Sequence, residues 1–260
     1  MDFALLASGS KGNSFVVKSD KTVLMIDCGS TKRHILKSLD TLNLELDDIK
    51  TLLITHEHSD HISQINMFKN KKVYAPISLD NIEVHKVTPY ESFKVKDIEV
   101  TPLPLSHDAS FTVGYILKSG NEKLSYITDT GYVSEKNIEM IRGSNYFVLE
   151  SNHDIEKLMQ TKRPLYIKSR IYSDRGHLCN ENAAEILNKT ITSKTKILIL
   201  AHISEEANTR ELALKVVSDK LKDRNNKIHI GSAGQYEMVR KGIVDEEVDM
   251  GSVSTVIGLE

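Results

Sequence analysis

Short apolar runs separated by polar turns fill the first third of the chain, where they predict the strands of a β-meander. These runs occupy residues 3–7, 15–18, 22–26 and 51–55. Apolar residues recur at helical spacing before the last run, which predicts a helix over residues 31–44. The last run stops at a polar, histidine-dense turn, and a helical pattern resumes from Ser59 onward.

Short strands continue to residue 127, with a hairpin turn expected at 119–121. Helical and extended patterns then alternate: helices at 134–142, 154–160, 180–188 and 209–221, strands at 146–150, 197–201 and 228–230. Two halves that each give strands and then helices indicate two sheets packed face to face with helices outside, an αββα sandwich. Residues 1–260 are expected to form one domain, with residues 245–260 as a loose tail.

The composition is that of a globular enzyme, with 40% hydrophobic and 27% charged residues. A net charge of −2 does not indicate a nucleic-acid partner, although a near-neutral protein can still carry a local basic cleft. Cys28 and Cys179 lie far apart, which argues against a disulfide framework or a structural zinc cluster. The chain lacks a signal-peptide pattern and any run of about 20 apolar residues, so a cytoplasmic protein with no membrane partner is expected.

A dense set of metal-binding residue types follows the run at 51–55. Residues 55–61 read THEHSDH, which places three histidines and an aspartate at the junction between a predicted strand and a predicted helix. A tight turn there can direct all four side chains at one point. Histidines also cluster on solvated turns, but such histidines have no reason to follow a buried strand in this spacing. The segment therefore predicts a metal site.

This motif resembles that of the metallo-β-lactamase superfamily, which implies the αββα fold and two divalent metal ions. Matching segments recur where later predicted strands end: Ser106-His107-Asp108, Thr128-Asp129-Thr130-Gly131 and Ala201-His202-Ile203. By that match, one ion would be held by His56, His58 and His107, the other by Asp60, His61 and His202, and Asp129 would bridge them. The interval between Asp129 and His202 is too short for the β-CASP insertion of RNA-processing relatives.

The resemblance also places Asp27, which ends the predicted strand 22–26, beneath the metals, where it would orient a ligand. A turn residue before Gly29 is the alternative. Two adjacent ions lower the pKa of a shared water and neutralise charge on the attacked and attacking oxygens. A hydroxide bridging the metals is then the expected nucleophile, with Asp60 and Asp129 as catalytic groups.

Four further segments resemble one branch of the superfamily, the YycJ or WalJ exonucleases: residues 7–14, 128–134, 150–154 and 174–178. The resemblance implies 5′-to-3′ degradation of DNA with manganese or zinc, action on a 5′-phosphorylated end, and a link to DNA repair; repair proteins as partners and the oligomeric state stay open. Cys179 departs from the pattern, because relatives usually carry a hydroxyl side chain there and a thiol is a weaker donor to phosphate.

Residues within these segments are candidates for contact with the substrate. Ser8, Ser10 and Asn13 can cradle phosphate oxygens, unless their segment is a plain hairpin turn. His153 and His177 can bind phosphate or protonate the leaving 3′ oxygen, or they are structural histidines.

A basic stretch between these two histidines adds further candidates. Lys168 and Arg170, with tyrosines nearby in sequence, can grip a DNA backbone or simply form a solvated face.

Three functions remain to be separated. The first is a dinuclear-metal exodeoxyribonuclease. The second keeps the same site for a small phosphodiester, thioester or lactone, and a closed pocket instead of a long basic groove would favour it. The third is a non-catalytic DNA-binding or scaffolding protein, against which the complete ligand set argues.

Overall fold

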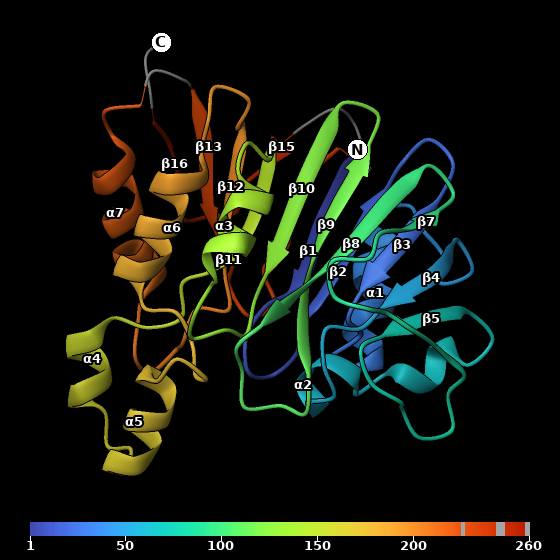
Figure 1. Ribbon diagram of the computed structural model, residues 1–260, viewed down its shortest axis with the longest axis horizontal. Coiled ribbons are helices and arrows are strands. Elements are labelled where there is room, and N and C mark those ends of the chain that lie inside the picture. Colours follow the sequence, from blue (N-terminus) through green and yellow to red (C-terminus); the bar gives the residue numbers. More distant parts are fainter. Residues whose placement is uncertain (225–226, 243–247, 258–260) are drawn as a thin grey trace.

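Two eight-stranded sheets form the centre of the molecule, packed face to face (Figure 1). The computed structural model describes residues 1–224, 227–242 and 248–257. The first sheet has the order β15-β14-β1-β2-β3-β4-β5-β6. Its strands are β1 Asp2–Ala7, β2 Ser14–Lys18, β3 Val23–Ile26, β4 Ile49–Leu53, β5 Lys72–Ala75, β6 Val84–Lys86, β14 Val239–Lys241 and β15 Val248–Asp249.

The second sheet has the order β16-β13-β12-β11-β10-β9-β8-β7. Its strands are β7 Phe93–Val95, β8 Ile98–Leu105, β9 Thr112–Ser119, β10 Glu122–Ile127, β11 Tyr146–Glu150, β12 Ile197–Ala201, β13 Ile228–Ser232 and β16 Ser254–Ile257. Strands β10 to β13 run parallel to one another, as do β3 to β6 in the first sheet. The carboxyl ends of the strands in each parallel set therefore lie at the same edge of their sheet.

Helices cover the outer face of each sheet, which confirms the predicted αββα sandwich (Figure 1). The first sheet is covered by α1 Lys32–Thr41, α2 Ser59–Ile62 and the 3₁₀ turn η1 Ile65–Phe68. The second is covered by α3 Glu135–Ile141, α6 Asn180–Thr190 and α7 Arg210–Leu221. A separate helical pair, α4 Ile155–Gln160 and α5 Leu165–Tyr172, packs around its own small apolar cluster.

The hydrophobic pattern of β1 shows why the strands read as continuous apolar runs. Phe3 and Leu5 face the core between the sheets, whereas Ala4 and Leu6 face the helices. A strand buried on both faces needs apolar residues at every position rather than alternation. The inter-sheet core is rich in aromatic rings, and Phe15 stacks on Tyr126 across it at 5.3 Å between ring centroids.

Three details differ from the sequence-based expectations. The helical pattern after Ser59 breaks into α2 and η1, and α5 forms where no helix was predicted. The expectation of a loose tail does not hold for residues 248–257, because β15 pairs with β14 and β16 pairs with β13 at the edges of opposite sheets. Residues 245–247 and 258–260 lie outside the described residues. None of the described helices is long and apolar enough to cross a membrane.

Candidate metal centre

The candidate site residues gather where parallel strands of the two sheets end. Asp27 follows β3 and His56 lies shortly after β4, while Asp129 follows β10, Glu150 ends β11 and His202 follows β12. Since each parallel set ends at one edge of its sheet, side chains distant in sequence meet at this edge. Asp27, Asp129 and His202 have φ values of 56°, 57° and 54°. A left-handed backbone at three non-glycine positions in one site is a strained arrangement of the kind found at functional centres.

The structure brings together donor atoms of all seven residues predicted as metal ligands. They form overlapping groups whose atoms lie within 4.8 Å of one another: His56, His58 and His107; Asp60, His61 and His202; and His56, His61 and Asp129. A further group of this kind joins Asp129 and His202 to Glu150 and His177, which were not predicted as ligands. Asp129 is central, because one of its carboxylate oxygens lies 3.3 Å from Nε2 of His61 and the other 3.9 Å from Nε2 of His107. Asp129 therefore lies between donor groups that could hold a divalent metal ion.

Hydrogen bonds on the outer side orient the imidazoles. Nδ1 of His61 donates to Asp27 at 2.8 Å, Nδ1 of His202 donates to Glu150 at 3.0 Å, and Nδ1 of His107 donates to the Gly176 carbonyl at 3.1 Å. Each bond leaves Nε2 as the nitrogen that can offer a lone pair to a cation, and such partners fix the tautomer of a metal-binding histidine.

Several buried nitrogen and oxygen atoms of the candidate ligands lack a hydrogen-bond partner. Nε2 of His56, Nε2 of His202 and Oδ2 of Asp129 are buried without a hydrogen-bond partner. Leaving buried polar atoms unpaired costs about 1–3 kcal/mol each. The donor set of imidazole nitrogens and carboxylate oxygens therefore fits zinc or manganese, and the residues present are chemically suited to that role.

Asp27 is completely buried and connects the first sheet to the site. Its Oδ1 accepts from the Thr55 backbone N–H and its Oδ2 from the Thr55 hydroxyl, in addition to the bond from His61. These bonds fix the backbone immediately before His56. The segment after Asp27 also packs directly against the segment that carries Asp60 and His61. Gly29 permits this close approach, because a Cβ at that position would lie only 1.5 Å from the Asp60 carbonyl oxygen.

The electrostatics of the cluster favour charge separation between carboxylates and imidazoles. Burial opposes ionisation of Asp129, but the neighbouring His202 and His61 outweigh it and hold the pKa of Asp129 well below its usual range. Burial likewise works against a charged His202, yet Asp129 and Glu150 raise its pKa to about 9. Burial lowers the pKa of His56. Cations bound at this centre would take the place of protons on His202.

A hollow of about 380 Å³ opens beside the cluster. Its lining includes His177, His202, Ser10 and Arg170. Nδ1 of His177 lies 2.6 Å from Glu150 and 4.0 Å from Asp129. Arg170 is paired with Asp108 at 2.9 Å, next to His107. The hollow thus joins positive groups to the candidate metal centre.

Other residues predicted to contact substrate have different positions. Ser8 and Asn13 are 3% and 1% exposed: the Ser8 hydroxyl accepts from the His202 backbone N–H, and the Asn13 amide donates to Asp60 and lies 2.9 Å from Nε2 of His61. They support the candidate ligands and do not face the hollow. Lys168 donates to the Met159 carbonyl and does not line the hollow.

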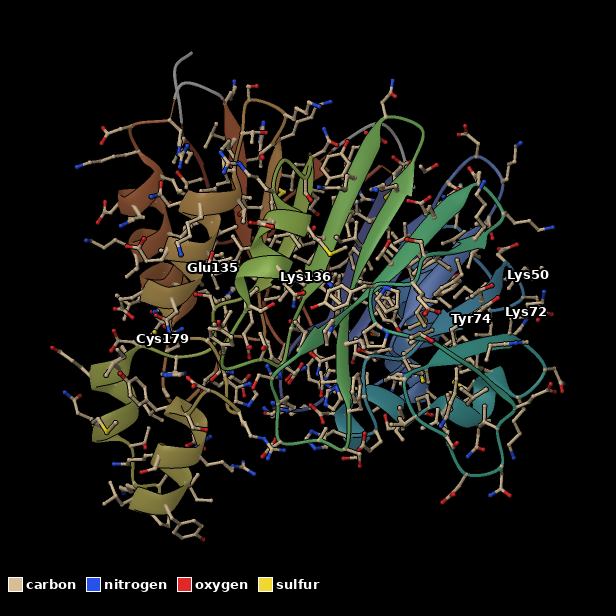
Figure 2. All side chains as sticks on the ribbon, viewed as in Figure 1. Lys50, Lys72, Tyr74, Glu135, Lys136 and Cys179 are labelled. Atoms are coloured by element: carbon tan, nitrogen blue, oxygen red, sulfur yellow. The ribbon has the colours of Figure 1, made fainter. Side chains whose placement is uncertain are left out.

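His153 and Cys179 also lie away from the hollow. His153 has no exposed surface, and burial lowers its pKa to about 4. Its ring lies beside Tyr172 of α5, out of contact with bulk solvent. Cys179, labelled in Figure 2, caps the N-terminus of α6 through a bond from the Asn182 N–H, and it is not among the residues that line the hollow.

Sequence reasoning missed the roles of Glu150 and Lys11, whereas Arg163 belongs to the basic stretch between His153 and His177 that was expected to contact DNA. Glu150 is fully buried and accepts from both His177 and His202. A lone carboxylate at the end of an otherwise apolar run was the available signal. Lys11 and Arg163 line the hollow and pair with Glu205 at 2.6 Å and Glu206 at 2.8 Å. No local pattern links residues so far apart in the chain.

Comparisons with known proteins agree with this geometry. Residues 22–203 match the beta-lactamase superfamily domain. The chain is 38% identical over 238 residues to exodeoxyribonuclease YycJ of Bacillus anthracis, covering 86% of this chain and 90% of that one. It is 33% identical over 235 residues to exodeoxyribonuclease WalJ of Streptococcus pneumoniae, covering 84% and 87%. The metallo-beta-lactamase fold protein YhfI of Bacillus subtilis superimposes with a TM-score of 0.70 at 14% identity, over 92% of this chain and 99% of that one.

Proposed function

This chain belongs to the beta-lactamase superfamily and to its YycJ/WalJ family, as a metal-dependent hydrolase, and from that membership we propose that it is an exodeoxyribonuclease. We extend the proposal to 5′-to-3′ degradation of 5′-phosphorylated DNA in a repair process. The single observation that carries the proposal is the convergence of seven nitrogen and oxygen donors beside a hollow lined by cationic side chains.

Two divalent ions would be held by the candidate ligands, one by His56, His58 and His107, the other by Asp60, His61 and His202, with Asp129 shared. Bound there, they would supply Lewis-acid neutralisation of phosphate charge and acidification of water. The chain itself orients these ligands through hydrogen bonds. Asp27 fixes the ring of His61, and Glu150 fixes the ring of His202. The Asn13 amide donates to the Asp60 carboxylate.

His177 is the residue placed to handle the proton of the leaving group. It lines the hollow, partly exposed, and Glu150 holds its Nδ1 so that Nε2 is free to act. Delivery of a proton from Nε2 to the departing 3′ oxygen would avoid expulsion of a bare alkoxide. We assign this role to His177 rather than His153, because His153 has no exposed surface from which to reach a substrate.

The cations around the hollow suit a polyanionic substrate. Lys11, Arg163 and Arg170 line it, and each forms an exposed ion pair with a carboxylate. Exposed ion pairs contribute only about 0–1 kcal/mol, so incoming phosphates can displace those carboxylates. Arginine also binds phosphate oxygens through two parallel N–H groups, which fixes the orientation of a backbone.

The test is incubation of purified protein with Mn²⁺ and end-labelled duplexes that carry either a 5′-phosphate or a 5′-hydroxyl. Progressive loss of nucleotides from the phosphorylated end supports the proposal, and Asp129→Ala should abolish it. Inertness toward every nucleic acid, together with turnover of a small phosphodiester, thioester or lactone, would overturn it. Degradation from the 3′ end would support the proposed exodeoxyribonuclease activity but contradict the proposed 5′-to-3′ direction.

A further inference from the structure

A second basic hollow lies away from the candidate metal centre. It measures about 480 Å³, and its lining includes five lysines: Lys50, Lys71, Lys72, Lys94 and Lys96. None of the described lining residues is acidic. Figure 2 shows Lys50, Lys72 and Tyr74 close together at the right-hand side of the molecule. Such a concentration of one charge stands out in a protein whose net charge is −2.

The hollow forms between β4 and β5 of the first sheet and β7 of the second. Lys50 and Lys72 come from β4 and β5 of the first sheet, and Lys94 comes from β7, the edge strand of the second. Tyr74 of β5 stacks on Phe93 of β7 at 4.4 Å between ring centroids. This stack ties the two sheets together at the hollow, so the lysines project from a rigid framework.

The lysines are largely uncompensated. Lys71 pairs with Asp47, whereas the other four form no ion pair with a carboxylate in the described part of the chain. Like charges gathered this closely repel one another, and the field they create attracts anions. Phosphate groups that neutralise lysines release counterions, which makes a nucleic-acid backbone a favourable partner for such a surface.

The position along β4 indicates which anion can use both sites. Lys50 stands near the start of β4, and His56 follows six residues later, past its end. At about 3.3 Å per residue the two positions lie up to roughly 20 Å apart. Phosphates of one DNA strand are spaced about 3.4 Å apart along the helix axis, so this upper bound corresponds to about six nucleotides. A DNA strand is long enough to span any distance up to this bound.

We propose that this lysine hollow binds the backbone of the substrate DNA about six nucleotides from the end held at the metal centre. The inference rests on the proposed exodeoxyribonuclease function. Contacts at both places would hold the duplex between successive cleavages. Lysines also protect sheet edges from pairing with other chains. If the lysines served only that purpose, DNA affinity would not depend on phosphates at particular positions.

The first measurement uses the double variant Lys50→Gln/Lys72→Gln and a control, Lys37→Gln/Lys222→Gln, which removes two exposed lysines elsewhere. Binding to a phosphorothioate duplex of about 20 base pairs is followed by fluorescence anisotropy at several salt concentrations. Each phosphate that is no longer neutralised should weaken binding by about five- to tenfold at 0.1 M salt and reduce the salt slope by about one. We expect both effects in the hollow variant and neither in the control.

The second measurement replaces roughly the fifth to eighth phosphates from the bound end with neutral methylphosphonates. Wild-type protein should lose affinity, and the hollow variant should be indifferent to the replacement. Equal behaviour of the hollow variant and the control, or equal sensitivity of all proteins to the neutral patch, would overturn this inference. Lysine-dependent binding by a wild-type protein that cannot degrade DNA with Mn²⁺ would instead overturn the proposed function alone.

Discussion

Asp27 and Glu150 hold corresponding positions on opposite sides of the candidate metal centre. Each is a fully buried carboxylate at the end of a strand, one in each sheet. Asp27 accepts from Nδ1 of His61 at 2.8 Å, and Glu150 accepts from Nδ1 of His202 at 3.0 Å. Each also accepts a backbone N–H, from Thr55 and Thr130 respectively. The two sheets thus supply equivalent supports for the histidines between them.

Replacing the first carboxylate should weaken metal binding without removing a ligand. In Asp27→Asn, the amide cannot provide the negative charge that orients His61, so we expect metal affinity to fall about 10- to 100-fold. Competition with a chromophoric chelator measures this. Asp219→Asn, on the exposed face of α7, is the control and should leave affinity unchanged. Unaltered affinity in Asp27→Asn would show that the carboxylate serves only the fold.

His177 and His153 should separate cleanly by kinetics. His177→Ala is expected to lower kcat about 10²- to 10⁴-fold while metal content stays unchanged, because the side chain lines the hollow and its assigned role is proton transfer. A loss of metal would instead make His177 a ligand, in the group that it forms with Asp129, Glu150 and His202. His153→Leu should change kcat by no more than several-fold, since the ring is fully buried. Rate measurements at saturating DNA, with metal analysis of each variant, test the pair. A reversed ranking would assign the proton transfer to His153.

Loading of metal should release protons. Burial opposes a charge on His202, but Asp129 and Glu150 raise its pKa to about 9, so its imidazole is protonated at neutral pH in protein stripped by a chelator. A metal requires the neutral ring, and affinity should therefore rise as pH increases toward 9. Calorimetry of Zn²⁺ binding in buffers of different ionisation enthalpy reports the protons released. Heats that do not depend on the buffer would contradict this protonation state.

Gly29 should tolerate no side chain. A Cβ there would meet the Asp60 carbonyl oxygen at 1.5 Å and force apart the segments that carry Asp27 and His61. We expect Gly29→Ala to destabilise the fold by at least about 3 kcal/mol and to lose metal. Gly120→Ala is the comparison: nothing lies within 4 Å, and its φ of 56° costs about 1 kcal/mol. Thermal unfolding of both variants decides; equal stability would refute the steric explanation.

Glu205 and Glu206 should compete with DNA for Lys11 and Arg163, which line the hollow beside the candidate metal centre. They pair with Lys11 and Arg163, and both carboxylates are largely exposed. Their removal in Glu205→Gln/Glu206→Gln should strengthen DNA binding about five- to tenfold at 0.1 M salt for each additional phosphate that the released cations neutralise. Anisotropy with phosphorothioate DNA measures the change. The control Glu181→Gln/Glu211→Gln removes the same charge from α6 and α7. An equal increase in the DNA affinity of the control would show that the effect comes from net charge and not from competition for Lys11 and Arg163.

The sequence by itself determined the layers of the fold and the candidate ligands. Strands such as β1 are apolar at every position because both faces are buried, and THEHSDH carries four donors within seven consecutive residues. These signals are local, so a single sequence reveals them. The superfamily resemblance then located His107, Asp129 and His202, each at the end of a predicted strand.

Tertiary structure alone decided what surrounds those ligands. Glu150 gains its importance by meeting His177 and His202, which lie far along the chain, and neighbouring segments bury His153, which the sequence alone could not show. The lysine hollow likewise joins β4 and β5 of one sheet to β7, the edge strand of the other. Burial and long-range contacts depend on how the elements pack, and no local spacing of residues encodes that packing.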